Sequence, residues 1–273
     1  MKNVIIKRII SIAIWLVFIA VFVISLGFSK TELNKMKCKS INVQIVDTTG
    51  NSFVEPNDII EFLNQKNYKI VGNYIKGFPL NKIENDINNY PSVKSTEVFT
   101  TLDGILHIVI VQREPILRII NYDCTSYYID CDGALFPLSE KYTARVLAAN
   151  GKINEPYNLR YTKDMAKTEA KDELGRKFIV DDLFILAKFI RTDKFLDAFI
   201  EQIFINNNDE IELVPKVGTF TILLGDIQNL EEKFTNLKAL ILIGLPREGW
   251  NKYETINIKY KNQVVCTKIN ENE

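Results

Sequence analysis

A run of uncharged, mostly apolar residues from Ile9 to Phe28 limits what this chain can fold into. As an α-helix with a rise of about 1.5 Å per residue, the run would span roughly 30 Å, the thickness of a bilayer's hydrocarbon core. A cleaved secretory signal has a shorter apolar region, of about 7–15 residues, and a cleavage site of small residues, which Ser25–Leu33 matches poorly. We therefore expect residues 9–28 to form an uncleaved transmembrane helix. A cleaved signal and a buried helix of a soluble protein are the weaker alternatives.

Basic residues flank the run on both sides, so the positive-inside rule does not orient it by itself. They are Lys2, Lys7 and Arg8 before the run and Lys30, Lys35, Lys37 and Lys39 after it. This rule is weak for long translocated domains, and only a short stub precedes the run. We therefore expect residues 1–8 in the cytoplasm, residues 29–39 as a linker and the remaining chain on the far side of the membrane.

The 34 acidic and 34 basic side chains give a net charge of zero. A nucleic-acid-binding surface would need a basic excess on one face, so no nucleic-acid partner is expected. The cysteines, Cys38, Cys124, Cys131 and Cys266, do not have the spacing of a zinc site. In an oxidising compartment Cys124 and Cys131 could form a disulfide; four independent, mostly buried thiols are the other interpretation.

Residues 40–113 show the pattern of a small α+β domain. Apolar residues first alternate, as in a strand, and then recur twice at helical spacing, with Pro56 in the first turn of one helix and Pro91 at the end of the other. Two strands follow, separated by Asp103 and Gly104, a pair that predicts a type I′ hairpin turn. The predicted order is therefore strand, helix, helix, strand, strand.

Residues 114–268 predict a second, larger domain, a mostly antiparallel sheet with a few helices, so the fold class of the whole chain is α+β. Strand-like runs surround two helices, which apolar stripes beginning at Leu183 and Leu230 indicate. The segment Asn154–Arg176 is polar and charged, and we expect a mobile loop or a frayed helix there.

Two short strands are predicted at the end of the chain. Ile256 and Ile258 alternate with polar residues, and Val264 and Val265 follow after a polar break. Because no later segment is available to pair with the second strand, we expect it to leave a row of N–H and C=O groups free at a sheet edge. Residues 269–273 are polar and are expected to form a frayed tail.

A catalytic site is not expected. His107 is the single histidine, so a Ser-His-Asp or Cys-His catalyst would have to use it, and no nucleophile motif accompanies it. Asp130–Gly133 resembles the start of a calcium loop, but Leu135 and Lys141 stand where that loop needs Gly and Glu. We expect a β-turn there instead, a structural or exposed role for His107, and no metal or cofactor.

The order of these segments resembles that of the FtsQ/DivIB cell-division proteins: a short stub, one membrane span, a small unit similar to a POTRA domain, and a β-rich domain. The similarity is greatest over residues 93–119, where a hairpin runs into an Arg-x-Pro junction at Arg113–Pro115. Residues 127–139, 211–226 and 256–265 resemble three further segments of the family, in the expected order.

This resemblance implies a non-enzymatic, single-pass scaffold in the inner membrane at the division septum, with its N-terminus cytoplasmic and its bulk periplasmic. The POTRA-like unit would contact upstream division proteins, and the β domain would bind FtsB/FtsL-type partners that add a strand beside its last strand. The partner-binding residues that it implies are Ile258, Lys259, Tyr260, Gln263, Val264 and Val265. Lys259 and Tyr260 stand where the family commonly has a basic residue followed by Tyr, and packing of Tyr260 in the core is the alternative for that residue.

Two other functions are kept as alternatives: another POTRA-bearing component of envelope assembly or transport, and a membrane-anchored hydrolase. The hydrolase would need a nucleophile that the sequence does not indicate. If Val265 lies on a docking strand, Val265→Pro should weaken binding of the partner without unfolding the domain.

Overall fold

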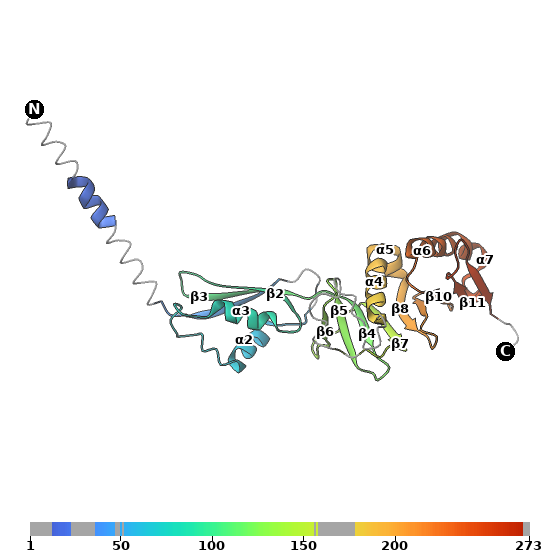
Figure 1. Ribbon diagram of the computed structural model, residues 1–273, viewed down its shortest axis with the longest axis horizontal. Coiled ribbons are helices and arrows are strands. Elements are labelled where there is room, and N and C mark those ends of the chain that lie inside the picture. The colour runs from blue at the N-terminus through green and yellow to red at the C-terminus, as the bar shows by residue number, and fades with distance from the viewer. Residues whose placement is uncertain are drawn as a thin grey trace, which may run out of the picture. The chain divides into compact units, whose positions relative to one another are not determined.

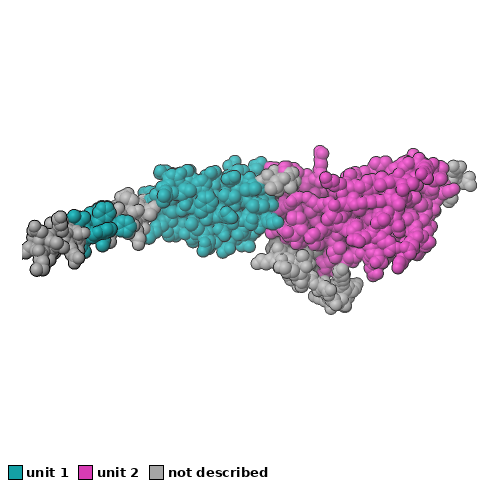
Figure 2. All heavy atoms as spheres, turned by 90° about the horizontal axis from the view of Figure 1, so that it is seen from above, with its two compact units in different colours: residues 1–48, 54–112 teal, residues 49–53, 113–273 magenta. Residues whose placement is uncertain are grey.

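A computed structural model describes residues 13–22, 36–46, 50, 52–155, 157 and 178–269. The chain divides into two compact units, which Figure 2 colours separately. Unit 1 comprises residues 1–48 and 54–112, and unit 2 comprises residues 49–53 and 113–273. Figure 1 shows the helices and strands of each unit and labels many of them.

The predicted transmembrane segment lies only partly within the described residues. Residues 13–22 form a helix with exposed side chains, whereas residues 9–12 and 23–28 lie outside the described part. Among the described residues, no helix combines the length and the apolar character needed to cross a bilayer. The span at 9–28 and the stub at 1–8 therefore stay predictions.

The end of the predicted linker already packs in unit 1. Cys38 is only 1% exposed, and its N–H donates to the Asn73 carbonyl at 2.9 Å. The Lys39 N–H donates to the Gly104 carbonyl at 2.8 Å. Residues 36–39 thus belong to the folded unit, while residues 29–35 lie outside the described part of the chain.

Unit 1 has the predicted order of elements. They are β1 (Ser40–Val46), α2 (Pro56–Gln65), α3 (Leu80–Asn88), β2 (Val93–Thr100) and β3 (Ile105–Gln112). Strand β3 is central, parallel to β1 and antiparallel to β2. Ile59 and Leu63 of α2, and Ile83 and Ile87 of α3, are at most 1% exposed and lie one helical turn apart. Every second residue of β3 is buried, so one face of the sheet and one face of each helix form the core.

The turn between β2 and β3 is not the predicted type I′ turn. That turn needs a positive φ at both central residues, but Asp103 is not among the residues with positive φ and Gly104 has φ of 89°. The Gly104 N–H donates to the Thr101 carbonyl, and the Thr101 N–H donates to the Ile105 carbonyl, each at 3.1 Å. This pattern fits a type I turn followed by a glycine bulge, in which Gly104 alone takes the left-handed conformation.

Unit 2 is built on a nine-stranded sheet in the order β12-β11-β10-β9-β8-β7-β4-β5-β6. The strands are β4 (Pro115–Ile120), β5 (Ser126–Asp130), β6 (Leu135–Pro137), β7 (Leu147–Gly151), β8 (Ile200–Ile205), β9 (Ile211–Pro215), β10 (Thr221–Gly225), β11 (Tyr253–Asn257) and β12 (Val265–Lys268). The β4–β7, β7–β8 and β10–β11 pairs are parallel, and the other neighbouring pairs are antiparallel. Most neighbouring pairs are therefore antiparallel, as predicted, but the three parallel pairs make the sheet a mixed one.

The helices of unit 2 contribute their apolar sides to the same core as the sheet. They are α4 (Ile179–Thr192), α5 (Lys194–Phe199), α6 (Leu230–Ala239), the π-helical η2 (Leu240–Gly244), α7 (Leu245–Glu248) and the 3₁₀ helix η3 (Trp250–Lys252). Leu183 of α4 and Phe234 of α6 join Leu213 and Ile256 of the sheet in one buried cluster, which confirms both predicted helical stripes. Helix α5 and strand β7 were not predicted, because α5 is short and the Leu-Ala-Ala-Asn-Gly sequence of β7 lacks β-branched residues.

The segment Asp130–Gly133 forms the predicted β-turn. The fully buried Asp130 carboxylate accepts hydrogen bonds from the N–H groups of Asp132 and Ala134 at 2.9 and 2.8 Å. It also accepts one from the Arg113 guanidinium at 2.7 Å. The Gly133 N–H closes the turn by donating to the Asp130 carbonyl at 3.0 Å. The carboxylate therefore stabilises the turn and the start of unit 2.

None of the four cysteines forms a disulfide, in agreement with four independent thiols, but the expectation that most of them are buried is wrong. Cys38 is buried, Cys124 is exposed, and Cys131 and Cys266 are half-buried. The alternative disulfide between Cys124 and Cys131 is not present.

Candidate functional site at the last strand

Strand β12 forms one end of the nine-stranded sheet and pairs with β11. The register places Val265 opposite Asn257 and Thr267 opposite Thr255. Within the described part of the chain, no strand lies beyond β12. One side of its backbone is therefore available to another chain.

The pairing of β11 with β10 determines which backbone groups of β11 point to β12. Ile258, directly after β11, donates its N–H to the Leu223 carbonyl of β10 at 3.0 Å. Successive residues of a strand direct their N–H and C=O groups to opposite sides. Asn257 and Thr255 therefore direct theirs away from β10 and toward β12.

On β12, the residues opposite these two, Val265 and Thr267, form hydrogen-bonded pairs with β11. Cys266 and Lys268 alternate with them and direct their N–H and C=O groups to the open edge. Ile269 continues the alternation, because its N–H donates at 3.0 Å to a carbonyl just before β11. The free edge thus presents the backbone of Cys266 and Lys268.

The side chains of β12 alternate between the two faces of the sheet. Val265, 45% exposed, and Thr267 lie on the face that does not contact the core. Cys266 lies on the other face, opposite the fully buried Ile256, and burial raises the pKa of its thiol. The edge therefore has one solvent-accessible face and one face that packs on the core.

The six residues predicted to bind a partner lie in three different environments. Ile258 is buried, Lys259 and Val264 are half-buried, and Tyr260, Gln263 and Val265 are exposed. Tyr260 is 52% exposed, so the alternative in which it packs in the core is wrong. Strand β11 ends at Asn257 and β12 begins at Val265, so all but the last of the six lie in the connection between these strands.

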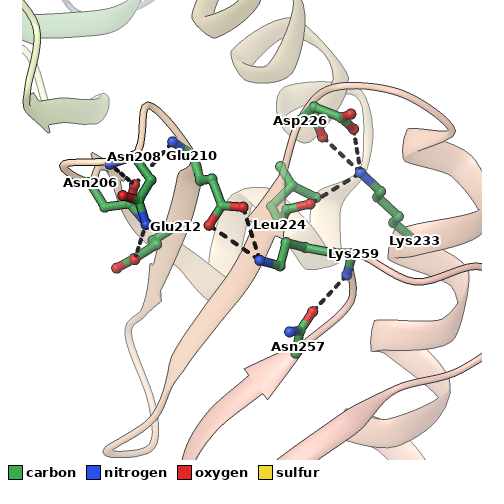
Figure 3. Close-up of polar contacts among 9 residues, drawn as sticks. All are labelled: Asn206, Asn208, Glu210, Glu212, Leu224, Asp226, Lys233, Asn257 and Lys259. Atoms are coloured by element: carbon green, nitrogen blue, oxygen red, sulfur yellow. Dashed lines mark hydrogen bonds and ion pairs between the residues drawn. The ribbon is translucent and has the colours of Figure 1, made fainter.

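Side-chain contacts hold this connection to the rest of unit 2, as Figure 3 shows in part. The Lys259 ammonium lies 3.0 and 3.2 Å from the two carboxylate oxygens of Glu210. The Asn262 N–H donates to the Glu232 carboxylate of α6 at 3.0 Å. The hairpin that ends in β12 is therefore attached both to the start of β9 and to α6.

A buried lysine stabilises the loop beside this hairpin. The Lys233 ammonium donates to the Leu224 carbonyl at 3.1 Å, to the Asp226 carbonyl at 2.9 Å and to the Asp226 carboxylate at 2.7 Å (Figure 3). These acceptors match the three N–H groups of an ammonium. The hydrogen bond from Lys233 lowers the pKa of Asp226, and the one from Lys259 lowers the pKa of Glu210.

The described residues outside this edge also bear on the sequence-based expectations for metal sites and for His107. They contain no group of three or more His, Cys, Asp or Glu placed to hold a metal ion. His107 of unit 1 is half-exposed, stacks on Phe99 with ring centroids 5.1 Å apart, and lies 3.5 Å from the Asn42 amide. These contacts agree with the predicted structural or exposed role.

A polar pocket of about 720 Å³ also occurs in unit 2. Its lining consists of Glu114, Pro115, Tyr142, Thr143, Arg145, Val146 and Arg191. The Arg191 guanidinium donates to the Glu114 carboxylate and, at 3.2 Å, to the Pro115 carbonyl.

Sequence reasoning found the region of the edge but missed the residues whose backbone is free. Cys266 and Lys268 were not named, because the register between two strands follows from the turn and the packing and not from either strand alone. Glu210 was missed because it precedes its partner Lys259 by 49 residues, and no local pattern marks such a contact.

Comparison with known families identifies both folded regions. Residues 114–267 match the family model described as FtsQ/DivIB, C-terminal related, and residues 36–111 match the POTRA-like domain. No curated protein matches the chain. The first match covers more than half of the chain and includes β11 and most of β12. The resemblance stated from the sequence is confirmed: the chain belongs to the FtsQ/DivIB family.

Proposed function

We propose that this protein is a membrane-anchored, non-enzymatic scaffold of the division machinery that binds FtsB/FtsL-type partners by strand addition to β12. Its FtsQ/DivIB and POTRA-like domains support a division-associated role, and domains of these kinds are generally non-catalytic. The observation that carries the docking site is the free edge of β12, where Cys266 and Lys268 direct their backbone groups outward.

In this proposal residues 9–28 anchor the protein in the inner membrane, with residues 1–8 in the cytoplasm and the bulk in the periplasm. A POTRA-like domain at 40–113 contacts upstream division proteins, and a β domain at 114–268 binds the FtsB/FtsL-type pair. A fluorescent fusion should then form septal rings in dividing cells. Uniform staining of the envelope would favour another POTRA-bearing assembly component.

The edge supplies only part of the binding free energy. Each backbone hydrogen bond contributes about 0.5–1.5 kcal/mol net, and two outward residues offer two donors and two acceptors. An added strand would also place its side chains beside Val265 and Thr267 on the accessible face. Tyr260, exposed at the connection, offers apolar surface for a further contact in this proposal.

The proposal is tested by Lys268→Pro. This change removes an outward N–H and places the proline ring where an added strand would lie, while the residues paired with β11 keep their hydrogen bonds. We expect affinity for the FtsB/FtsL-type pair to fall at least about tenfold, which corresponds to roughly 1.4 kcal/mol. The melting temperature should change little, because proline is tolerated on an edge whose N–H faces solvent.

Thr267→Pro is the matched control, since Thr267 is the adjacent exposed residue and its N–H points to β11. This variant should destabilise the hairpin itself, and so should Val265→Pro, for which the sequence had predicted a change in binding alone. If Lys268→Pro binds the pair as tightly as the unchanged protein, strand addition at β12 is not the docking mode.

A further inference from the structure

Lys259 is directed into unit 2, although the family resemblance places it among the partner-binding residues. Its ammonium contacts both carboxylate oxygens of Glu210, at 3.0 and 3.2 Å (Figure 3). The two side chains are 27% and 38% exposed, so the pair is partly shielded from solvent. The charge of Lys259 is therefore already compensated within the unit.

The alkyl chain of Lys259 crosses the end of β10 beside Gly225, where a larger residue would be disfavoured. A Cβ added to Gly225 would lie 2.8 Å from both Cγ and Cδ of Lys259. Gly225 also has φ of 81°, which disfavours other residues. The missing side chain of Gly225 thus leaves the space through which Lys259 reaches Glu210.

Glu210 lies in the turn between β8 and β9, which is closed by hydrogen bonds to Asn206. The Asn206 side-chain oxygen accepts the N–H groups of Asn208 and Glu210, at 2.9 and 3.0 Å (Figure 3). The Asn206 N–H donates to the Glu210 carbonyl at 3.1 Å. The turn that carries the Glu210 carboxylate is therefore held by hydrogen bonds that do not involve Lys259.

We infer that Lys259 is a positioning residue, which holds the hairpin that ends in β12 against Glu210 and does not contact the partner. This inference rests on the proposed docking at β12. Lys259 follows β11 by two residues, and the hairpin's other attachment, from Asn262 to Glu232, lies three residues further on. Loss of the ion pair should leave the fold intact and let β12 separate from β11 more often.

The strength of the Lys259–Glu210 ion pair limits how much its loss can change partner affinity and the opening of β12. Half-exposed ion pairs change an equilibrium by about two- to fivefold, so the affinity for the partner should fall by no more than about fivefold. The opening of β12 should increase by a similar factor. In the unbound protein, the protected N–H groups of Val265 and Thr267 should then exchange with solvent about two- to fivefold faster.

The test compares Lys259→Met, Glu210→Gln and the double variant with Lys261→Met as the control. Methionine keeps the apolar chain over Gly225 and removes the charge, and Lys261 is an exposed lysine of the same connection. Binding of the FtsB/FtsL-type pair and hydrogen exchange at Val265 and Thr267 are both measured. A positioning role predicts that both single variants lose affinity and protection from exchange to the same extent. The double variant should lose no more than either, and Lys261→Met should change neither quantity.

Two results would overturn the inference. If Lys259→Met weakens binding while Glu210→Gln leaves it unchanged or strengthens it, Lys259 contacts the partner directly. If neither variant changes exchange at β12, the pair does not hold the strand. The exchange measurement needs no partner, so it remains decisive even if Lys268→Pro shows that docking does not occur at this edge.

Discussion

Two acidic side chains of unit 2, the buried Asp130 and the half-buried Glu155, are stabilised by different neighbours. Asp130 accepts a hydrogen bond from the Arg113 guanidinium in addition to two from backbone N–H groups. Glu155 accepts the N–H groups of Ile179 and Val180, at 2.7 and 3.3 Å, at the start of α4. Burial outweighs these two bonds and raises the pKa of Glu155 to about 7. The charged form of Glu155 is therefore disfavoured in the folded protein near neutral pH.

This shift predicts that Glu155 makes unit 2 less stable as the pH rises. The ordinary pKa of the group is 4.5 and the folded value is about 7, so the folded state binds more protons in that window. The stabilisation is complete below pH 4.5 and is lost as the pH approaches 7, with a slope of at most about 1.4 kcal/mol per pH unit. Glu155→Gln should remove this dependence.

The measurement is the melting temperature at pH 5 and pH 8, compared between the unchanged protein and Glu155→Gln. The melting temperature of Glu155→Gln, relative to that of the unchanged protein, should be higher at pH 8 than at pH 5. Parallel changes in both proteins would show that Glu155 titrates near its ordinary pKa.

At the scale of elements, one carboxylate organises the junction of three helices. Asp193 follows α4 and caps α5 by accepting the N–H groups of Phe195 and Leu196, at 3.0 and 3.2 Å. It also accepts a hydrogen bond from Lys238 of α6, which is the main cause of its lowered pKa. The short helix α5 thus depends on a residue outside it.

We expect Asp193→Ala to lower the free energy of unfolding of unit 2 at neutral pH, because it removes the cap of α5 and the ion-pair partner of Lys238. Asp193→Asn keeps an acceptor at the cap and should cost less. Because the folded pKa of Asp193 is lowered, its charge-dependent stabilisation is present at neutral pH and is lost on acidification through that pKa.

Urea unfolding of the three proteins at pH 7 and pH 3 provides the measurement. The difference in the free energy of unfolding between the unchanged protein and Asp193→Asn should be smaller at pH 3 than at pH 7. An equal gap at both pH values would contradict a role for the Lys238 pair.

At the scale of the whole molecule, the chain contributes to unit 2 before it completes unit 1. Phe53 belongs to unit 2, where its ring makes edge contacts with Tyr128, Phe136 and Tyr142 at centroid distances of 5.6, 5.5 and 5.0 Å. A fragment that begins at Arg113 would lack this ring. A single chain that keeps Phe53 with the rest of unit 2 must therefore also contain residues 54–112 of unit 1.

Limited trypsin digestion should spare the bond after Arg113. The Arg113 side chain is 16% exposed and paired with the buried Asp130, and Pro115 holds Glu114 in an extended conformation at the start of β4. The first cuts should fall between Asn154 and Arg176, a polar segment mostly outside the described residues that the sequence predicts to be a mobile loop or a frayed helix. Mass spectrometry of early fragments shows the order in which the sites are cleaved, and a heat-unfolded sample is the control. An early fragment that ends at Arg113 would contradict the prediction.

The sequence by itself determined the elements of unit 1, the helical stripes of α4 and α6, and the family. Amphipathic spacing, Pro56 and Pro91 are properties of contiguous segments, so they act before any distant contact forms. The apolar character of residues 9–28 is likewise a property of one contiguous segment, and its role as a membrane span stays a prediction.

Only the tertiary structure decided which backbone groups of β12 are free, where Lys259 binds and to which unit Phe53 belongs. The outward direction of Cys266 and Lys268 depends on the register with β11 and on which groups of β11 the parallel pairing with β10 leaves for β12. A shift of one residue would reverse the direction of every N–H, and the sequence of the strand would look the same. Contacts between distant segments form only when packing closes the chain between them, so local patterns do not encode them.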